Sequence, residues 1–150
     1  MTDQLSIPGF VRPRRREREP VSFATGQSLS VFVPGTKLES LNVSLRGTTP
    51  GARFAAAARV KQTRQAVDLA LRKTLRTRPA LPLVVTVTRV APGRGLDEHD
   101  NLPGACKHVV DAVAAWLGID DRDPRISWRY AQCSDGRTVG VGIRFERRAG

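Results

Sequence analysis

The chain has 150 residues, a formal net charge of +11 at pH 7 and 40% hydrophobic residues. This length fits one compact domain with a modest core. No run approaches the roughly 20 consecutive apolar residues that span a bilayer, and the N-terminal segment lacks the apolar stretch of a secretory signal, so we expect a soluble, cytoplasmic protein. Cys106 and Cys133 lie far apart without CxxC spacing, which favours neither a disulfide framework nor a zinc site.

The excess of positive charge indicates a polyanionic partner. The chain has 25 Lys and Arg residues against 14 Asp and Glu residues, and an unpaired positive surface attracts nucleic acid first and an anionic membrane second. A block of arginines precedes residue 20 in a segment that is too poor in apolar residues to fold. We therefore expect residues 1–27 to form a disordered basic arm and residues 28–150 to form the folded domain.

The first half of the domain predicts a strand, a loop and a helix. Residues 28–34 alternate apolar and other side chains, which favours a strand, and residues 35–51 resemble a loop. Helix formers dominate residues 51–78. Four apolar side chains in this segment cluster on one side at 100° per residue: Val60, Val67, Leu71 and Leu75. The helix is therefore amphipathic with a basic outer face, and Arg64 lies near its apolar edge.

The second half predicts a buried strand, a helix and two further strands. Residues 81–90 are β-branched and almost continuously apolar, which suits a central strand covered on both faces. Residues 103–117 follow as a helix that ends at Gly118. Residues 125–133 and 138–147 alternate as strands connected across Ser134-Asp135-Gly136. The order β-α-β-α-β-β predicts an α+β fold with one mixed sheet.

Half of the acidic residues are concentrated in one part of this basic chain: Asp97, Glu98, Asp100, Asp111, Asp120, Asp121 and Asp123. They form either a solvated patch that pairs with arginines or a cation site, because Mg²⁺ prefers carboxylate oxygens. In an extended segment, Glu98 and Asp100 lie on one side, about 6 to 7 Å apart. Asp120 and Asp121 follow at the far end of a helix about 22 Å long. The two groups therefore meet only if the chain folds back or a second subunit supplies one of them.

Three further side chains near the acidic residues are candidates for chemistry. Lys107 lies four residues before Asp111, a spacing that favours a surface ion pair. Alternatively, Lys107 donates to a scissile phosphate and stabilises the charge that grows in the transition state. His99 and His108 flank the same region, and either is a candidate general base near neutral pH.

These residues resemble the signature of a known family. The matching residues are Asp100-Asn101-Leu102, Lys107, Asp111-Ala112-Val113 and Asp120-Asp121. This pattern is similar to that of RusA-type Holliday-junction resolvases, small Mg²⁺-dependent endonucleases of phage and prophage origin. Ser40-Leu41-Asn42 and Arg46 also resemble the Asn-bearing loop that follows the family's first strand. The sequence departs from the family by having Glu98 in place of an aspartate and a longer interval before Lys107.

The resemblance implies a RusA-like fold, a homodimer and resolution of four-way DNA junctions in recombination and repair. It implies the catalytic residues Asp100, Lys107 and Asp121. It implies that Mg²⁺, with Mn²⁺ as its substitute, is held by Glu98, Asp100, Asp120 and Asp121. With the positive charge, it predicts DNA contacts from Asn42, Arg46, Arg64, Arg72 and Lys73.

Two other functions remain open from the sequence. A DNA-binding protein without catalysis would recognise junctions or duplex by charge and shape, and it explains the charge of +11 equally well. It does not explain the concentrated carboxylates. A membrane-surface protein is supported only by the basic arm, which has too few apolar residues to insert.

Overall fold

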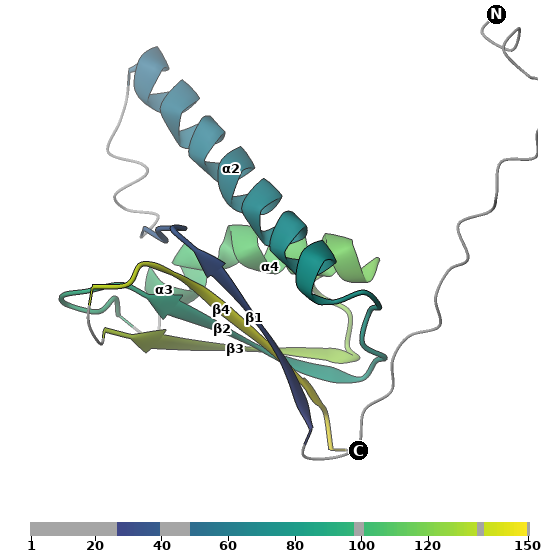
Figure 1. The fold of residues 1–150 in the computed structure, drawn as a ribbon. Coiled ribbons are helices and arrows are strands. Elements are labelled where there is room, and N and C mark those ends of the chain that lie inside the picture. The colour runs from purple at the N-terminus through teal and green to yellow at the C-terminus, as the bar shows by residue number, and fades with distance from the viewer. Residues whose placement is uncertain (1–26, 40–48, 98–100, 135–136, 150) are drawn as a thin grey trace, which may run out of the picture.

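One four-stranded sheet carries helices on a single side (Figure 1). The structure is a computed structural model that describes residues 27–39, 49–97, 101–134 and 137–149. The strands are β1 (Ser28–Pro34), β2 (Leu83–Val90), β3 (Ile126–Cys133) and β4 (Gly140–Arg147), and the helices are α2 (Pro50–Thr74), α3 (Asn101–Ala105) and α4 (Lys107–Leu117). The predicted α+β class is therefore confirmed. The predicted basic arm lies outside the described residues, apart from Gln27.

The strands are arranged in the order β1-β4-β2-β3. β4 pairs antiparallel with both β1 and β2, whereas β2 and β3 are parallel neighbours. Parallel neighbours need a crossover connection, and α3 and α4 provide it. β3 and β4 follow one another in the sequence but are separated by β2, so the turn predicted at residues 134–136 does not join adjacent strands.

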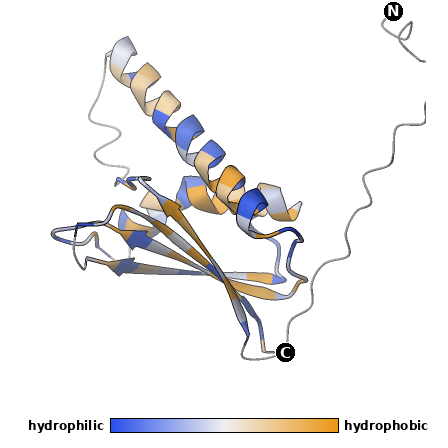
Figure 2. Cartoon of the chain, viewed as in Figure 1, coloured by the Kyte–Doolittle hydropathy of each residue, from blue (hydrophilic) through white to orange (hydrophobic). Residues whose placement is uncertain are grey.

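The core lies between the helices and one face of the sheet. Phe145 of β4 and Val85 of β2 are fully buried there, as are Leu71 of α2 and Val109 of α4. Trp116 packs its ring against Phe145 with 5.8 Å between the ring centroids. Each such side chain contributes about 1.5 to 3 kcal/mol through its burial. In Figure 2 the apolar residues accordingly concentrate on α4 and along the strands.

The prediction that β2 is covered on both faces is wrong for the residues that the structure describes. The helices lie on one side only (Figure 1), and Leu83, Val85 and Val87 are buried beneath them. Val84, Thr86 and Thr88 point to the opposite side, where Val84 is buried and the two threonines are half-buried although no described helix covers them. Most residues of this run are β-branched, and threonine and valine suit an open sheet face as well as a covered one.

The long helix α2 extends beyond the sheet. Thr49 caps it by accepting a hydrogen bond from the Ala52 N–H, and Pro50 occupies its first turn. Its 25 residues span about 37 Å, whereas an eight-residue strand spans about 26 Å. The first turns of α2 therefore project from the fold (Figure 1), and Phe54 is 79% exposed. The helix ends at Thr74, before the predicted boundary at residue 78.

The helix predicted at residues 103–117 is divided into α3 and α4 at Cys106. The backbone hydrogen bonds continue through the division, because Cys106 N–H donates to Leu102 O and Val110 N–H donates to Cys106 O. Gly118 ends α4 in the left-handed conformation at φ 74°, as predicted. Among the described residues, no helix is long and apolar enough to cross a membrane.

Gly140→Ala should lower the free energy of unfolding by about 1 to 3 kcal/mol, measured by urea denaturation. A Cβ at Gly140 would lie 2.6 Å from the Val33 carbonyl oxygen, and that oxygen belongs to paired backbone. Gly142→Ala is the matched control, because its nearest neighbour would be Thr88 Cβ at an ordinary 3.5 Å. Equal stability of the two variants would contradict the close approach of β1 to β4.

Candidate active site

The loop after β2 is fastened to β3 by one side chain. Leu96 N–H donates to Gln132 Oε1 at 2.9 Å, and Gln132 Nε2 donates to Leu96 O at 2.7 Å. Leu102 N–H, in α3, then donates to Asp97 O at 2.8 Å. The predicted ligands Glu98 and Asp100 lie in the sequence just after this fastened stretch, but outside the described residues.

The second acidic pair lies in the turn between α4 and β3. Asp123 N–H donates to Asp120 O at 3.0 Å, and Trp128 Nε1–H donates to Asp121 O at 2.9 Å. The pKa of the Asp120 carboxyl is lowered, first by the Arg122 backbone N–H that it accepts and next by a hydrogen bond with Asp121. The chain therefore turns back along β3, and Asp121 lies beside that strand.

Helix-facing side chains of β3 thus bind the backbone of Asp121 and of Leu96, the residue before Asp97. Trp128 and Gln132 are four residues apart on this strand, or about 13 Å. Tyr130 lies between them, and its pKa is raised by burial first and then by Cys106 and Asp121. Trp128 and Gln132 are therefore closer to each other than the two ends of the predicted helix are. Within the described residues, no three His, Cys, Asp or Glu side chains gather into a metal-binding group.

Lys107 and Asp111 form the predicted ion pair, with 3.8 Å between Lys107 Nζ and Asp111 Oδ1. Asp111 also pairs with Arg64 of α2, whose Nη2 lies 3.0 Å from Asp111 Oδ2. This contact explains why an arginine occupies the apolar edge of α2: it reaches across to α4. Because the groups are largely exposed, each pair contributes at most about 1 kcal/mol to stability. The proposed role of Lys107 at a phosphate stays a prediction.

His108 is a neutral imidazole at the packed side of α4. Burial lowers its pKa first, and the neighbouring charges of Arg64 and Lys107 lower it further, against the opposing effect of Asp111. Its Nδ1 is buried and has no hydrogen-bond partner among the described residues. The lowered pKa favours the neutral imidazole, and the role of His108 as a general base stays a prediction. The other predicted base, His99, lies outside the described residues.

A second loop is held at the same end of the sheet by a residue that the sequence analysis missed. Arg89 of β2 is 9% exposed, and its Nε donates to Leu38 O at 3.1 Å. Arg89 and Gln132 are partners in the β2/β3 register, so their side chains share one face. The chain continues from Leu38 toward the predicted DNA-binding residues Asn42 and Arg46, which lie outside the described residues. A charge in an apolar strand was the signal that could have identified Arg89.

The Cys106 thiol is buried in the core. Burial raises the pKa of Cys106 to about 12, and Arg89 offsets only part of this shift. Its thiol is therefore protonated. Neither Cys106 nor Cys133 forms a disulfide, and Cys133 is half-buried.

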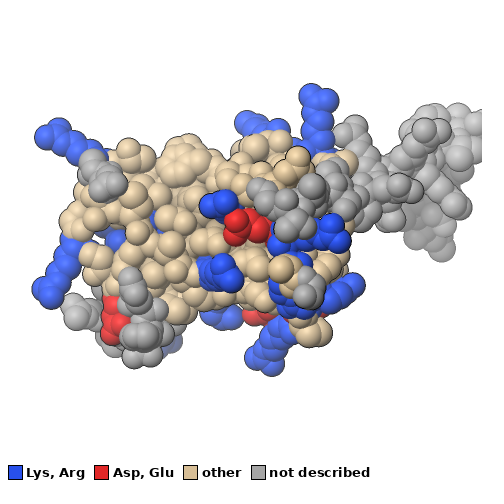
Figure 3. Space-filling view, turned by 90° about the horizontal axis from the view of Figure 1, so that it is seen from below, with Lys and Arg blue, Asp and Glu red and all other residues tan. Residues whose placement is uncertain are grey.

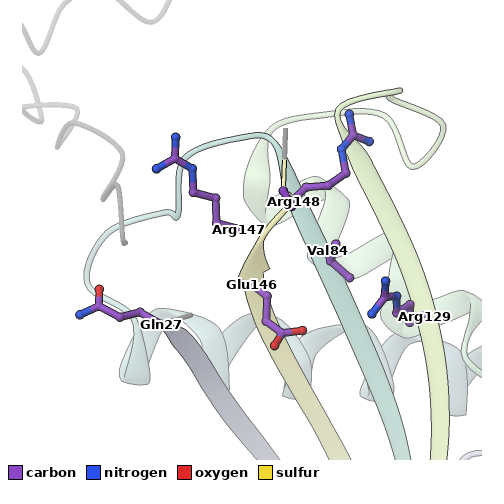
Figure 4. Close-up of a pocket in the computed structure, with 7 residues that line it drawn as sticks. Gln27, Val84, Arg129, Glu146, Arg147 and Arg148 are labelled. Carbon is purple, nitrogen blue, oxygen red and sulfur yellow. The ribbon is translucent and has the colours of Figure 1, made fainter. Parts of the chain in front are cut away.

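Exposed Lys and Arg side chains occur both on the helices and on the open sheet face. Arg72 and Lys73 lie in the last turn of α2 and are exposed, with Arg72 2.9 Å from Asp68. The open sheet face also carries basic side chains over a largely uncharged surface (Figure 3). At one end of that face a pocket of about 350 Å³ is lined by Gln27, Val84, Arg129, Glu146, Arg147, Arg148 and Ala149 (Figure 4). This pocket is separated by the sheet from the helix-facing residues described above.

Comparison with known proteins adds no assignment: no protein-family model matches the chain, and no curated protein matches it in sequence. The function is therefore argued from the residues and their geometry.

The wild-type free energy of unfolding should fall more steeply on acidification than that of His108→Gln. Burial places the folded pKa of His108 below its unfolded value of about 6.5, so the unfolded state takes up a proton first as the pH falls. The contribution of His108 is complete above that value and is lost below it. Urea denaturation between about pH 7.5 and about pH 5 measures the difference. Parallel pH profiles would contradict a lowered pKa.

Proposed function

We propose that the protein is a Mg²⁺-dependent endonuclease that resolves four-way DNA junctions, with a RusA-like topology. The observation that supports this most is that helix-facing side chains of β3 bind the backbone of Asp121 and of Leu96, the residue before Asp97. Trp128 holds the backbone of Asp121, and Gln132 holds Leu96, two residues before Glu98.

The donor chemistry fits a hard cation such as Mg²⁺. The proposed ligands Glu98, Asp100 and Asp121 or Asp120 offer carboxylate oxygens, and the lowered pKa of Asp120 keeps that carboxyl ionised at neutral pH. The nearby thiol of Cys106 is protonated and does not compete as a soft ligand. When bound, the ion would supply an activated water and polarise the scissile phosphate.

Lys107 is suited to contact the phosphate because Asp111 also forms an ion pair with a second cation, Arg64. Arg64 approaches Asp111 at 3.0 Å, whereas Lys107 is 3.8 Å away with a side chain that is 58% exposed. Lys107 can therefore leave Asp111 without stranding an unpaired carboxylate. In the proposed reaction its ammonium donates to a phosphate oxygen and stabilises the developing negative charge.

The DNA would lie against the basic surface of α2. Between Pro50 and Thr74 there are six Lys and Arg residues and one acidic residue, Asp68. Such a surface neutralises phosphates and releases counterions, which is the main source of sequence-independent affinity for DNA. Arg64 links this helix to α4, which begins at Lys107, so the basic surface is continuous with the proposed catalytic lysine. That the protein is a homodimer is proposed from the sequence resemblance alone.

Asp100→Asn should lower junction cleavage by about 100-fold or more, because it removes a proposed ligand charge. Junction binding in the presence of a chelator should be unchanged or slightly tighter, since one charge that repels phosphate is lost. Cleavage of a labelled four-way junction beside a linear duplex measures the first effect, and a mobility-shift titration measures the second.

Asp123→Asn is the matched control for this substitution. The Asp123 carboxylate pairs with Arg125 at 2.7 Å and belongs to no proposed ligand set, so cleavage should persist. Loss of binding together with cleavage in Asp100→Asn would mean that Asp100 is structural. A wild-type protein that binds junctions and makes no cut with any divalent ion would be the non-catalytic DNA-binding protein instead.

Replacing Arg72 and Lys73 together by alanine should weaken DNA binding and lower the slope of log K against log salt concentration by about 2. Both side chains are exposed in the last turn of α2. Arg129→Ala is the control, because this exposed arginine of β3 pairs with Thr86 and lines the pocket of the open sheet face. A larger loss of affinity in the control would mean that the DNA lies against the open sheet face, which would contradict this proposal.

A further inference from the structure

Gln132 occupies a position where the strand otherwise carries apolar and aromatic side chains. The helix-facing residues that precede it on β3 are Ile126, Trp128 and Tyr130, which pack against the core. A polar amide on such a face is costly unless its donor and acceptor are both satisfied. Its hydrogen bonds to Leu96 satisfy one of each, at 2.7 and 2.9 Å.

The loop is shaped to receive this amide. Leu96 offers its N–H and its carbonyl to the same side chain, so Gln132 replaces the backbone of a neighbouring strand. At Gly95 an added Cβ would lie 2.9 to 3.0 Å from three atoms of the Gln132 amide group. A side chain at Gly95 would therefore require the Gln132 amide to shift, and glycine leaves room for the observed approach.

We propose that Gln132 is a positioning residue that fastens the loop after β2 to β3 and thereby sets where the carboxylates following Leu96 begin. The same strand binds the backbone of Asp121 through Trp128, so β3 holds both Leu96 and Asp121. The proposal rests on the proposed function, because it assigns Gln132 a role in metal affinity. Gln132 itself contacts neither metal nor DNA in this role.

Hydrogen exchange at the Leu96 amide tests the fastening without any assay of activity. Gln132→Ala should lose the protection of Leu96 N–H while the amides of the β2/β3 ladder stay protected. Gln132→Glu adds a test by conservative replacement. An ionised glutamate at position 132 repels the Leu96 carbonyl oxygen, whereas a protonated one can accept from Leu96 N–H and donate to Leu96 O. The protection factor of the Leu96 amide in Gln132→Glu should therefore rise on acidification. The protection factor in Gln132→Ala should not change in this way.

Metal affinity tests the consequence. In Gln132→Ala the dissociation constant for Mg²⁺, measured by calorimetry without DNA, should rise by about 10-fold or more, as is typical when support behind ligands is removed. The half-saturating Mg²⁺ concentration for junction cleavage should rise in parallel, and excess Mg²⁺ should restore most of the rate. Junction binding with chelator should match wild type. Gln65→Ala, at an exposed position of α2, is the control and should change none of these values.

The outcomes separate this proposal from the proposed function. Unchanged Leu96 protection in Gln132→Ala overturns the fastening, and lost protection with wild-type Mg²⁺ affinity overturns the positioning role. In both cases the nuclease proposal stands if the wild type cleaves. A wild-type protein that binds no Mg²⁺ overturns both, because Gln132 would then have no metal site to support.

Discussion

The parallel pairing of β2 with β3 determines where the proposed site residues lie. Two parallel neighbours cannot be joined by a tight turn, so the chain must leave the end of β2 and return to the start of β3. α3 and α4 make this return across one face of the sheet. The acidic segments consequently flank this crossover, one before α3 and one after α4. Any metal site that uses both must bring them together along β3.

Polar side chains in the helix-facing layer provide that connection. Most of this layer is apolar, yet Arg89 and Gln132 lie side by side at the ends of β2 and β3. Each bonds to the backbone of a different loop, at Leu38 and Leu96. Buried polar groups of this kind are costly to leave unpaired, so the loops gain a defined place relative to the sheet.

The sequence predicted most of the elements because their signals are local. The alternation in residues 28–34 and the glycine after Leu117 correspond to β1 and to the end of α4. Arg64 lies at the apolar edge of its helix as predicted, but its ion pair with Asp111 of α4 was not predicted from the sequence. Coverage of β2 on both faces was predicted wrongly, because β-branched residues alone do not reveal how many helix layers pack on a sheet.

The candidate site was predicted less completely, because part of it depends on strand order. Nothing local in the sequence shows that Gln132 meets Leu96, 36 positions away, since that contact exists only when β3 pairs with β2. The role of Trp128 at Asp121 depends likewise on the turn between α4 and β3. Glu98, Asp100, Asn42 and Arg46 stay predictions from the sequence, because they lie outside the described residues.

The central claim is that both acidic segments bind one metal ion beside β3. Paramagnetic broadening by Mn²⁺ in an amide and indole NMR spectrum tests it most directly. One bound ion should broaden the Leu96 amide and the Trp128 indole N–H together and leave Arg53, at the far end of α2, sharp. Added Mg²⁺ should restore both signals in parallel. Broadening of only one of the two signals, or of neither, would contradict a single site formed by the two segments.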